Sequence, residues 1–295
     1  MEVIEMAGYN SRRVLKAACK VAATLFSGLT ILLSFVTWED LNIQGFFGKS
    51  IVFICIILFS ISAALLWICV LKKEFTVYEK GINKIGICYG DIMRLGFPKK
   101  NREKRTVVIP VNTCFDTIVD ENIAENKKLL VSPEAIHGQW LLKFCEERMD
   151  RSELDRKISE YLESRIPKEI LLREKKERGN LNNYEIGTVV PVAGSNKVTF
   201  LLVALSEFDE NNNAQSSKDK VIQCAESILD FQRKKGQGYD LYLPLMGTGL
   251  SGADLSPKDS VRILKSFFQL HADEIRGTVN IVIYSEQKSQ VSIYD

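Results

Sequence analysis

Two long uncharged runs dominate the hydrophobic pattern of the chain. Residues 21–38 provide 18 consecutive positions without a charge, and residues 50–71 provide 22. At about 1.5 Å per residue, helices over these runs reach roughly 27 and 33 Å, enough to cross a bilayer core of about 30 Å. The rest of the sequence has no comparable run. The pattern therefore predicts two transmembrane helices, at residues 17–38 and 50–71, joined by a short external loop at residues 39–49.

A cleaved signal peptide and a buried core helix are the alternatives for these two runs. The first run lacks a clear small-x-small cleavage site and is followed by another uncharged run, which favours a hairpin. The second run is long for a soluble core helix and has Trp67 near its end. The interpretation as two spans is therefore preferred.

The charges that flank the two runs predict their orientation. Arg12, Arg13, Lys16 and Lys20 precede the first run, and Lys72 and Lys73 follow the second. The loop between them carries Glu39 and Asp40 against Lys49. Positive residues are retained on the cytoplasmic side, so both termini are expected there. The chain then has a cytoplasmic tail at residues 1–16 and a cytoplasmic domain at residues 72–295.

Short β-rich runs alternate with helical patterns beyond residue 72. Strands are expected at residues 75–79, 85–89, 106–111, 187–193, 198–206, 239–245 and 279–284. Helices are expected to begin after Ser132, Ser217 and Ser256, because serine caps a first helical turn. The first of these patterns leads into a charged, helical insert at about residues 151–183. This alternation predicts a three-layer α/β domain with a mixed sheet.

Charge and cysteine usage narrow the classes of function. Lys and Arg number 39 against 37 Asp and Glu, so there is no electrostatic reason to expect nucleic acid as a partner. The seven cysteines are an odd number and include no C-x-x-C pair. A disulfide framework or a zinc site needs paired spacings, so buried thiols in a reducing compartment are expected. No metal and no cofactor are predicted.

The pattern G-x-G-x-x-G at Gly247, Gly249 and Gly252 follows one predicted strand and precedes a capped helix. Glycines let the backbone approach a ligand closely, and the N–H groups of such a loop bind anions. A Rossmann fingerprint would need further βαβ units after it, and a Walker A loop would need a following Lys-Ser/Thr. The loop therefore predicts a phosphate-binding site near the end of the domain.

Two upstream patches complete a possible site. Gly90-Asp91-Ile92 follows an early strand, and Asn112 ends the run Thr106–Val111, followed by Thr113-Cys114-Phe115-Asp116-Thr117. With the late glycine loop, this set resembles the macrodomain family, which binds ADP-ribose and its relatives. The resemblance implies a macrodomain-like mixed sheet over most of residues 75–284, with no clear counterpart for the insert.

The resemblance also implies roles for single residues. Asp91 would accept a hydrogen bond from the adenine amino group, Asn112 would contact the distal ribose, and the late loop would surround the diphosphate. The predicted ligand-binding residues are Asp91, Ile92, Asn112, Phe115, Asp116, Gly247, Thr248, Gly249, Leu250, Ser251 and Gly252. No catalytic residue is predicted.

One departure from the family pattern points to a divergent branch. Typical macrodomains have a glycine-rich run shortly after the asparagine, whereas residues 113–126 contain no glycine. The sequence is similar to a branch that reads I-P-V-N-x-x-F-D-T with a downstream H-G, here His137-Gly138. That branch occurs fused to paired transmembrane helices in bacterial anti-phage systems of the Thoeris type. There a TIR-domain enzyme makes an ADP-ribose-derived signal for a membrane effector.

Structural roles remain open for the same residues. Asp91 could cap the turn after its strand, and Asn112 and Asp116 could be turn residues. His137 and His271 lie at helix ends, where a lone histidine is usually structural. Trp140 and Phe115 are aromatic residues of the kind that more often pack in a core than bind a ligand.

Two classes of function remain. The first is a signal-binding effector at the bacterial inner membrane, expected to be a homo-oligomer, whose helices disrupt the membrane when the domain binds its ligand. The second is a membrane-tethered ADP-ribosyl hydrolase, which needs an activated water near the anomeric carbon. Asp116 and Asp120 are the first carboxylates at the place of the missing glycine-rich loop. The effector is preferred.

Overall fold

The computed structural model describes residues 10–38, 40, 41, 43, 45–100, 103–120, 130–208, 214–249 and 255–295. The chain divides into a smaller unit that ends at Lys73 and a larger unit that begins at Glu74. The predicted cytoplasmic domain begins two residues earlier, at residue 72.

The smaller unit consists of two long helices, α2 (Ser11–Leu33) and α3 (Gly45–Leu65), the second continued by a π-helical segment, η1 (Leu66–Leu71). Both are long and apolar enough to cross a membrane, with mean hydropathy of 1.5 for α2 and 2.9 for Gly45–Leu71. They pack against each other, and the rings of Phe26 and Phe53 lie 5.1 Å apart. Both helices begin earlier than the uncharged runs, because lysine and arginine near a helix end do not interrupt it.

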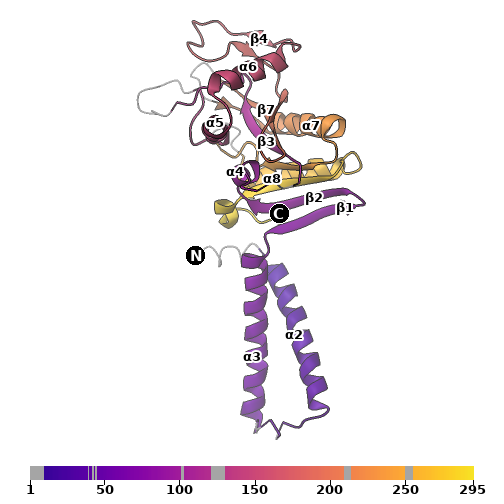
Figure 1. Ribbon diagram of the computed structural model, residues 1–295. Helices are drawn as coiled ribbons and strands as arrows, with labels where there is room; N and C mark the ends of the chain where they lie inside the picture. The colour runs from indigo at the N-terminus through magenta and orange to yellow at the C-terminus, as the bar shows by residue number, and fades with distance from the viewer. Residues whose placement is uncertain are drawn as a thin grey trace. The chain divides into compact units, whose positions relative to one another are not determined.

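A mixed sheet forms the centre of the larger unit (Figure 1). Its strands are β1 (Glu74–Lys80), β2 (Asn83–Gly90), β3 (Arg105–Asn112), β6 (Val189–Ala193), β7 (Val198–Phe208), β8 (Ala214–Gln215), β9 (Asp240–Pro244) and β10 (Thr278–Tyr284). The order is β1-β2-β10-β9-β3-β7-β6, with β8 paired to β7. The five strands from β2 to β7 run parallel, and the strands beside them are antiparallel. The predicted mixed sheet is confirmed.

Strand β3 shows why an uninterrupted apolar run becomes a central parallel strand. Its residues from Arg105 to Ile109 are buried, as expected for a strand covered on both faces. Pro110 has no N–H to donate. It lies beyond Val107, where the pairing of β3 with β9 ends, so it removes no hydrogen bond from that side of the ladder.

Helices cover both faces of the sheet, so the unit has three layers. On one side α4 (Ile92–Gly96), α5 (Ile136–Glu147) and α6 (Arg151–Leu162) share a core with β3 and β7, and Figure 1 shows α7 (Lys218–Lys235) on the other side of these strands from α5. The last long helix, α8 (Pro257–Leu270), contacts α7 and β10. Trp140 and Phe144 of α5 pack on Phe200 of β7, with ring centroids 5.5 and 5.7 Å away.

Two of the three predicted helix starts are confirmed and one is wrong. Ser217 and Ser256 cap α7 and α8, and each accepts a hydrogen bond from a backbone N–H of the first turn. After Ser132 the chain instead makes a turn, in which Ala135 N donates to Ser132 O, and α5 begins at Ile136. The reason is tertiary, because Gly138 packs directly against the carbonyl oxygen of Ser132.

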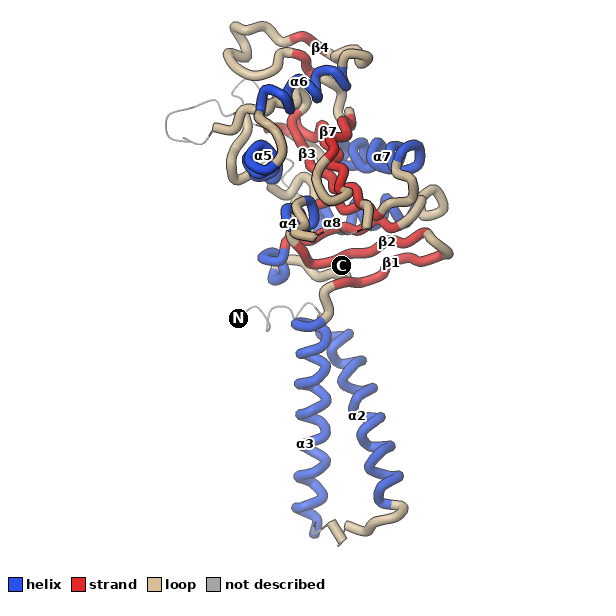
Figure 2. The backbone as a smooth tube through the Cα atoms, viewed as in Figure 1, coloured by secondary structure: helices blue, strands red, loops and turns tan. Residues whose placement is uncertain are grey.

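The insert is helical only in its first part. Helix α6 ends at Leu162, and residues 163–183 form an irregular loop with a two-residue hairpin, β4 (Glu169–Ile170) and β5 (Asn182–Asn183). Figure 2 shows loop rather than helix on either side of β4. Pro167 and Gly179, which has a φ of 77°, are both unfavourable inside a helix, so the charged sequence between them does not continue α6.

Candidate functional site

A cavity of about 770 Å³ lies at the carboxyl ends of the parallel strands. Its lining includes the terminal residues of β2, β3, β7 and β10: Gly90, Asn112, Phe208 and Tyr284. Pro244, the last residue of β9, also lines it. Ligands of open α/β sheets bind at this edge, and the volume suits a molecule of nucleotide size. The topology therefore gathers at one place the strand ends that the sequence spaces far apart.

The glycine loop after β9 forms one wall of the cavity. Gly247 has a φ of 80°, a conformation that favours glycine, and its carbonyl accepts a hydrogen bond from Leu255 N at 3.3 Å. Gly249 is exposed and has open space where a Cβ would be. Thr248 lines the cavity between them. The predicted contacts at Leu250, Ser251 and Gly252 lie outside the described residues.

Helix α8 begins just after this loop. The Ser256 hydroxyl caps it by accepting a hydrogen bond from Asp259 N at 3.1 Å, and Pro257 occupies the first helical position. Further along, the hydroxyl of Ser260 donates to Met246 O at 2.8 Å and fixes the start of the loop on the helix. The N-terminus of a helix carries partial positive charge, so the loop lies in a setting that favours an anion.

Asp91 lines the cavity and also caps a helix. One carboxylate oxygen accepts a hydrogen bond from Met93 N at 2.8 Å, and the other lies 3.5 Å from Arg94 Nε. The side chain is 30% exposed, so it remains accessible beside Ile92, which also lines the cavity. The structural role and the predicted ligand role are therefore compatible at this position.

Asn112 organises the turn after β3 and lines the cavity. Its side-chain oxygen accepts hydrogen bonds from Cys114 N at 3.1 Å and from Asp116 N at 3.2 Å. Its amide group donates to Leu130 O at 3.5 Å. The structure thus gives Asn112 the alternative role of a turn residue and places it at the cavity.

Phe115 and Asp116 are placed away from the cavity, contrary to the sequence prediction. Phe115 has a φ of 52° and packs edge-on against Tyr184 in the core, with ring centroids 6.0 Å apart. The fully buried Asp116 carboxylate lies 2.7 Å from Lys176 Nζ. Burial raises the pKa of Asp116, and the Lys176 ammonium opposes that shift. The turn closed by Asn112 directs both side chains into the interior.

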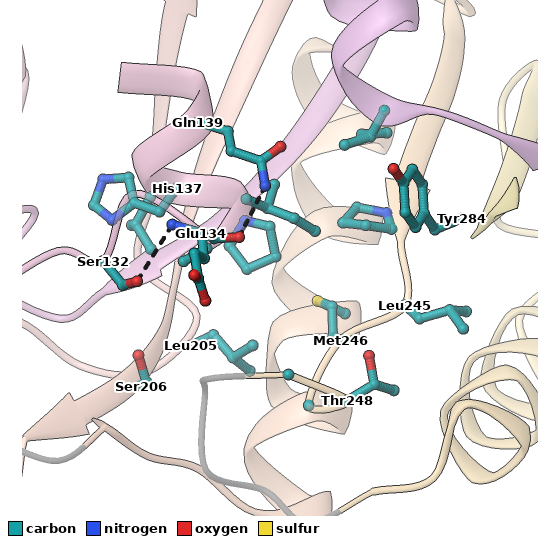
Figure 3. Close-up of a pocket in the computed structure, with 18 of the residues that line it drawn as sticks. Ser132, Glu134, His137, Gln139, Leu205, Ser206, Leu245, Met246, Thr248 and Tyr284 are labelled. Atoms are coloured by element: carbon teal, nitrogen blue, oxygen red, sulfur yellow. Dashed lines mark hydrogen bonds between the residues drawn. The ribbon is translucent and has the colours of Figure 1, made fainter. Parts of the chain in front are cut away.

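A second wall of the cavity, which the sequence pattern did not predict, is formed by residues 130–139. Ser132 Oγ accepts a hydrogen bond from Glu134 N at 3.3 Å, and Gln139 Nε2 donates to Glu134 O at 2.8 Å, as Figure 3 shows. Apart from the pair His137-Gly138, nothing in the pattern indicated this segment. The other missed lining residues Ser206 and Tyr284 lie at strand ends, a signal that could have found them.

His137 contributes an uncharged ring to the cavity. Burial lowers its pKa to about 3, because the charged form loses its hydration there. Among the described lining residues there is no lysine or arginine, whereas Asp91 and Glu134 are acidic. A phosphate would therefore be bound by backbone N–H groups rather than by cationic side chains. No three His, Cys, Asp or Glu side chains in the described part of the chain are grouped to bind a metal ion.

Solved structures with partial similarity to this chain include macrodomains. The Oceanobacillus iheyensis macrodomain with ADP is 13% identical, with a TM-score of 0.41 over 75% of this chain and 92% of that one. The Trypanosoma brucei macrodomain in complex with ADP-ribose is 14% identical, with a TM-score of 0.37 over 69% of this chain and 65% of that one. These overlaps are partial, and no residue role is taken from them.

Sequence comparison gives a more specific result. The curated Thoeris protein ThsA of Bacillus amyloliquefaciens (strain Y2) is 24% identical over 217 residues, which are 72% of this chain and 66% of that protein. The chain thus spans slightly less than two thirds of that relative. The family model for the macro domain of Thoeris protein ThsA matches residues 85–284, which is more than half of the chain. The chain therefore belongs to the family of Thoeris ThsA macro domains.

Proposed function

We propose that the larger unit binds an ADP-ribose-derived signal made by a TIR-domain enzyme and that the chain is a membrane effector of Thoeris defence. The observation that carries this proposal is the cavity itself. It combines the Gly247–Gly249 loop, Asp91 and Asn112 at the carboxyl ends of the parallel strands β9, β2 and β3. Each of these three features was expected from the macrodomain resemblance, and each lines the same space.

The proposed ligand lies across the strand ends. Its adenine is near Asp91 and Tyr284, its diphosphate is at the glycine loop and the start of α8, and its distal ribose is near Asn112. Two properties of the cavity support this orientation. The loop offers backbone N–H groups where no lining lysine or arginine is described, and the Asp91 carboxylate can accept a hydrogen bond from an amino group.

Binding without hydrolysis is favoured by the state of the two carboxylates at the place of the missing glycine-rich loop. Asp116 pairs with Lys176 at 2.7 Å and Asp120 pairs with Arg178 at 2.8 Å, and neither lines the cavity. A general base must lie within hydrogen-bond reach of the water that it activates. Both carboxylates are occupied elsewhere, which supports a sensor over an ADP-ribosyl hydrolase.

The membrane part of the proposal rests on the smaller unit. We propose that α2 and α3 with η1 contain the two spans, at residues 17–38 and 50–71, that residues 1–16 and 72–295 are cytoplasmic, and that residues 39–49 are external. Large side chains such as Phe46, Phe47 and Phe59 are 84%, 84% and 61% exposed within the chain. Apolar surface of this extent is stable in lipid and unfavourable in water.

The ligand site is tested with full-length protein in detergent and ADP-ribose as the probe. ADP-ribose should raise the thermal unfolding temperature of the wild type, because a ligand of the folded state stabilises it by mass action. Gly249→Glu should abolish this increase, because it adds negative charge at the proposed diphosphate position.

Gly249→Ala is the matched control. A Cβ at this position meets no described atom within 4 Å, so the alanine variant introduces no clash there. The alanine variant should respond to ADP-ribose as the wild type does. Equal stabilisation of the glutamate variant would remove the loop from the site, and no stabilisation of the wild type would contradict the proposed ligand.

A further inference from the structure

The loop of the insert is joined to the segment after β3 by two ion pairs with buried carboxylates. Lys176 Nζ lies 2.7 Å from Asp116 Oδ2, and the two side chains are 5% and 0% exposed. Arg178 donates to both oxygens of Asp120, at 2.8 and 3.1 Å, and the Asp120 side chain is 3% exposed. The paired residues are about 60 positions apart in the sequence.

Hydrogen bonds from Asn180 complete this junction. Asn180 N donates to Asp116 Oδ1 at 2.7 Å, and Asn180 Nδ2 donates to Phe115 O at 3.0 Å. Lys176 Nζ also donates to Asn180 O at 2.7 Å, which closes the insert loop on itself. Gly179 lies between them at positive φ, and a Cβ there would be 2.1 Å from Asp116 Oδ1. Both oxygens of the buried Asp116 carboxylate are therefore satisfied by the insert.

The same two aspartates position residues that line the cavity. Asp116 N donates to the side-chain oxygen of Asn112 at 3.2 Å. Asp120 Oδ2 accepts a hydrogen bond from Leu130 N at 2.7 Å, and Asp120 N donates to Val131 O at 3.0 Å. Asn112, Leu130 and Val131 all line the cavity. Each of these three residues is thus hydrogen-bonded to Asp116 or Asp120, and the insert supplies the cation that pairs with each aspartate.

A buried ion pair adds little net stability compared with apolar packing of the same volume, because both charges lose their hydration. What it provides is directional bonding, since a misplaced partner would leave a buried charge unsatisfied. The arrangement at Asp116 and Asp120 therefore fixes the geometry of this wall more than it adds to the stability of the fold.

We propose that Lys176 and Arg178 are positioning residues for the ligand site, and that the insert keeps the wall formed by Asn112, Leu130 and Val131 in its binding geometry. This inference rests on the proposed binding of an ADP-ribose-type ligand. It makes the ribose end of the ligand dependent on the insert, whereas the adenosine end beside Asp91 is independent of it.

The test uses full-length protein in detergent and compares ADP-ribose with AMP by calorimetry. Arg178→Gln leaves Asp120 its bond from Leu130 N but removes its cationic partner. The affinity for ADP-ribose should fall at least tenfold, roughly the loss of one hydrogen bond to a charged group. The affinity for AMP should change by less than about twofold, because AMP lacks the distal ribose. Arg178→Lys should recover part of the loss, because it restores the charge without the bidentate geometry.

Arg173→Gln is the matched control. Arg173 is an exposed arginine of the same insert whose hydrogen bond goes to Glu177 O, away from the cavity wall. It should bind both probes as the wild type does. Hydrogen exchange in peptides covering residues 130–139 should become faster in Arg178→Gln and remain unchanged in Arg173→Gln.

The possible outcomes distinguish failure of the proposed ligand binding from failure of the proposed positioning role of the insert. Wild-type protein that binds neither ADP-ribose nor AMP would overturn the proposed function and this inference with it. Wild-type binding of ADP-ribose combined with an unchanged affinity in Arg178→Gln would overturn the inference alone. An equal loss for ADP-ribose and AMP would do the same, because it would show general damage to the fold.

Discussion

His137 is a buried residue at the cavity whose own charge state is set by its burial. The ring lies at the start of α5 and stays neutral at physiological pH, because burial lowers its pKa to about 3. A cationic imidazole would attract a diphosphate directly, whereas a neutral one can only donate or accept one hydrogen bond. In the proposed site, an anion would therefore be bound mainly by backbone N–H groups of the Gly247–Gly249 loop.

The shifted pKa predicts a pH dependence of stability that His137 controls. In the unfolded chain the ring takes up a proton near pH 6.5, and in the folded chain it does so only near pH 3. Between these values the unfolded state binds one more proton, so the free energy of unfolding falls as the pH falls, by about 1.4 kcal/mol per pH unit. Denaturant titrations from pH 4 to 7 should show His137→Gln with a slope smaller by about one proton. Identical slopes would contradict the assignment.

At the residue scale, one strand end was sufficient to place some of the predicted side chains at the cavity. Asp91 and Asn112 directly follow or end strands that the hydrophobic pattern located, Gly247 lies three residues beyond β9, and all three line the cavity. Phe115 and Asp116 lie only a few positions further on, yet they face the core. Their orientation depends on the side chain of Asn112 and on Lys176, which is 60 residues away from Asp116. The sequence around Phe115 and Asp116 does not include Lys176, so a local pattern could not predict their orientation.

At the scale of elements, the longer helices and strands could be predicted because each has a cause in its local sequence. Serine caps and apolar faces define α7 and α8, and continuous apolar runs define β3 and β7. The two-residue strands β4 and β5 exist only through their pairing with each other, so composition cannot reveal them. The predicted start of α5 after Ser132 was wrong because Gly138 packs against the Ser132 turn, and this packing overrides the capping signal of the serine.

The effect of Gly138→Ala on the free energy of unfolding has opposite signs for helix propensity and for this packing, so the substitution distinguishes between them. Propensity alone predicts that alanine stabilises a helix by up to about 1 kcal/mol relative to glycine. In α5 the added Cβ would lie 2.1 Å from the backbone oxygen of Ser132, so the turn or the helix must move. We expect a loss of about 1–3 kcal/mol in the free energy of unfolding, measured by denaturant titration. A gain in stability would contradict this expectation, because it would show that the Ser132 turn can shift at little cost to make room for the added Cβ.

At the scale of the whole molecule, a sensor must couple ligand binding to its membrane part. A ligand shifts an equilibrium only if it binds one state better than the other, so ADP-ribose must favour an assembled or open state. Small residues such as Ser60, Ala63 and Ala64 of α3 permit close approach of helices. Ser60 and Ala64 are buried within the smaller unit, whereas Ala63 remains partly exposed and available to another copy.

Dye release from liposomes tests this coupling. ADP-ribose should cause leakage with full-length protein, and a chain of residues 72–295 should bind it without leakage. Ala63→Trp should reduce leakage but not ligand affinity, because it adds bulk where helices of neighbouring copies would meet, and Ala63→Ser should behave as the wild type does. Turnover of ADP-ribose with no leakage at any concentration would favour the hydrolase instead.

Strand β10 imposes an order of events during synthesis of the chain. It lies between β2 and β9, and its Thr278 pairs with Lys84 of β2, so the sheet remains in two pieces until β10 has been made. Contacts so distant in sequence form slowly, whereas α2 and α3 are neighbours along the chain and can pair early. If the hairpin spans the membrane as proposed, it could therefore insert well before the strand ends around Asp91 and Gly247 come together. An unfinished molecule would then be anchored without a complete ligand site, and only a finished one could respond to the proposed ligand.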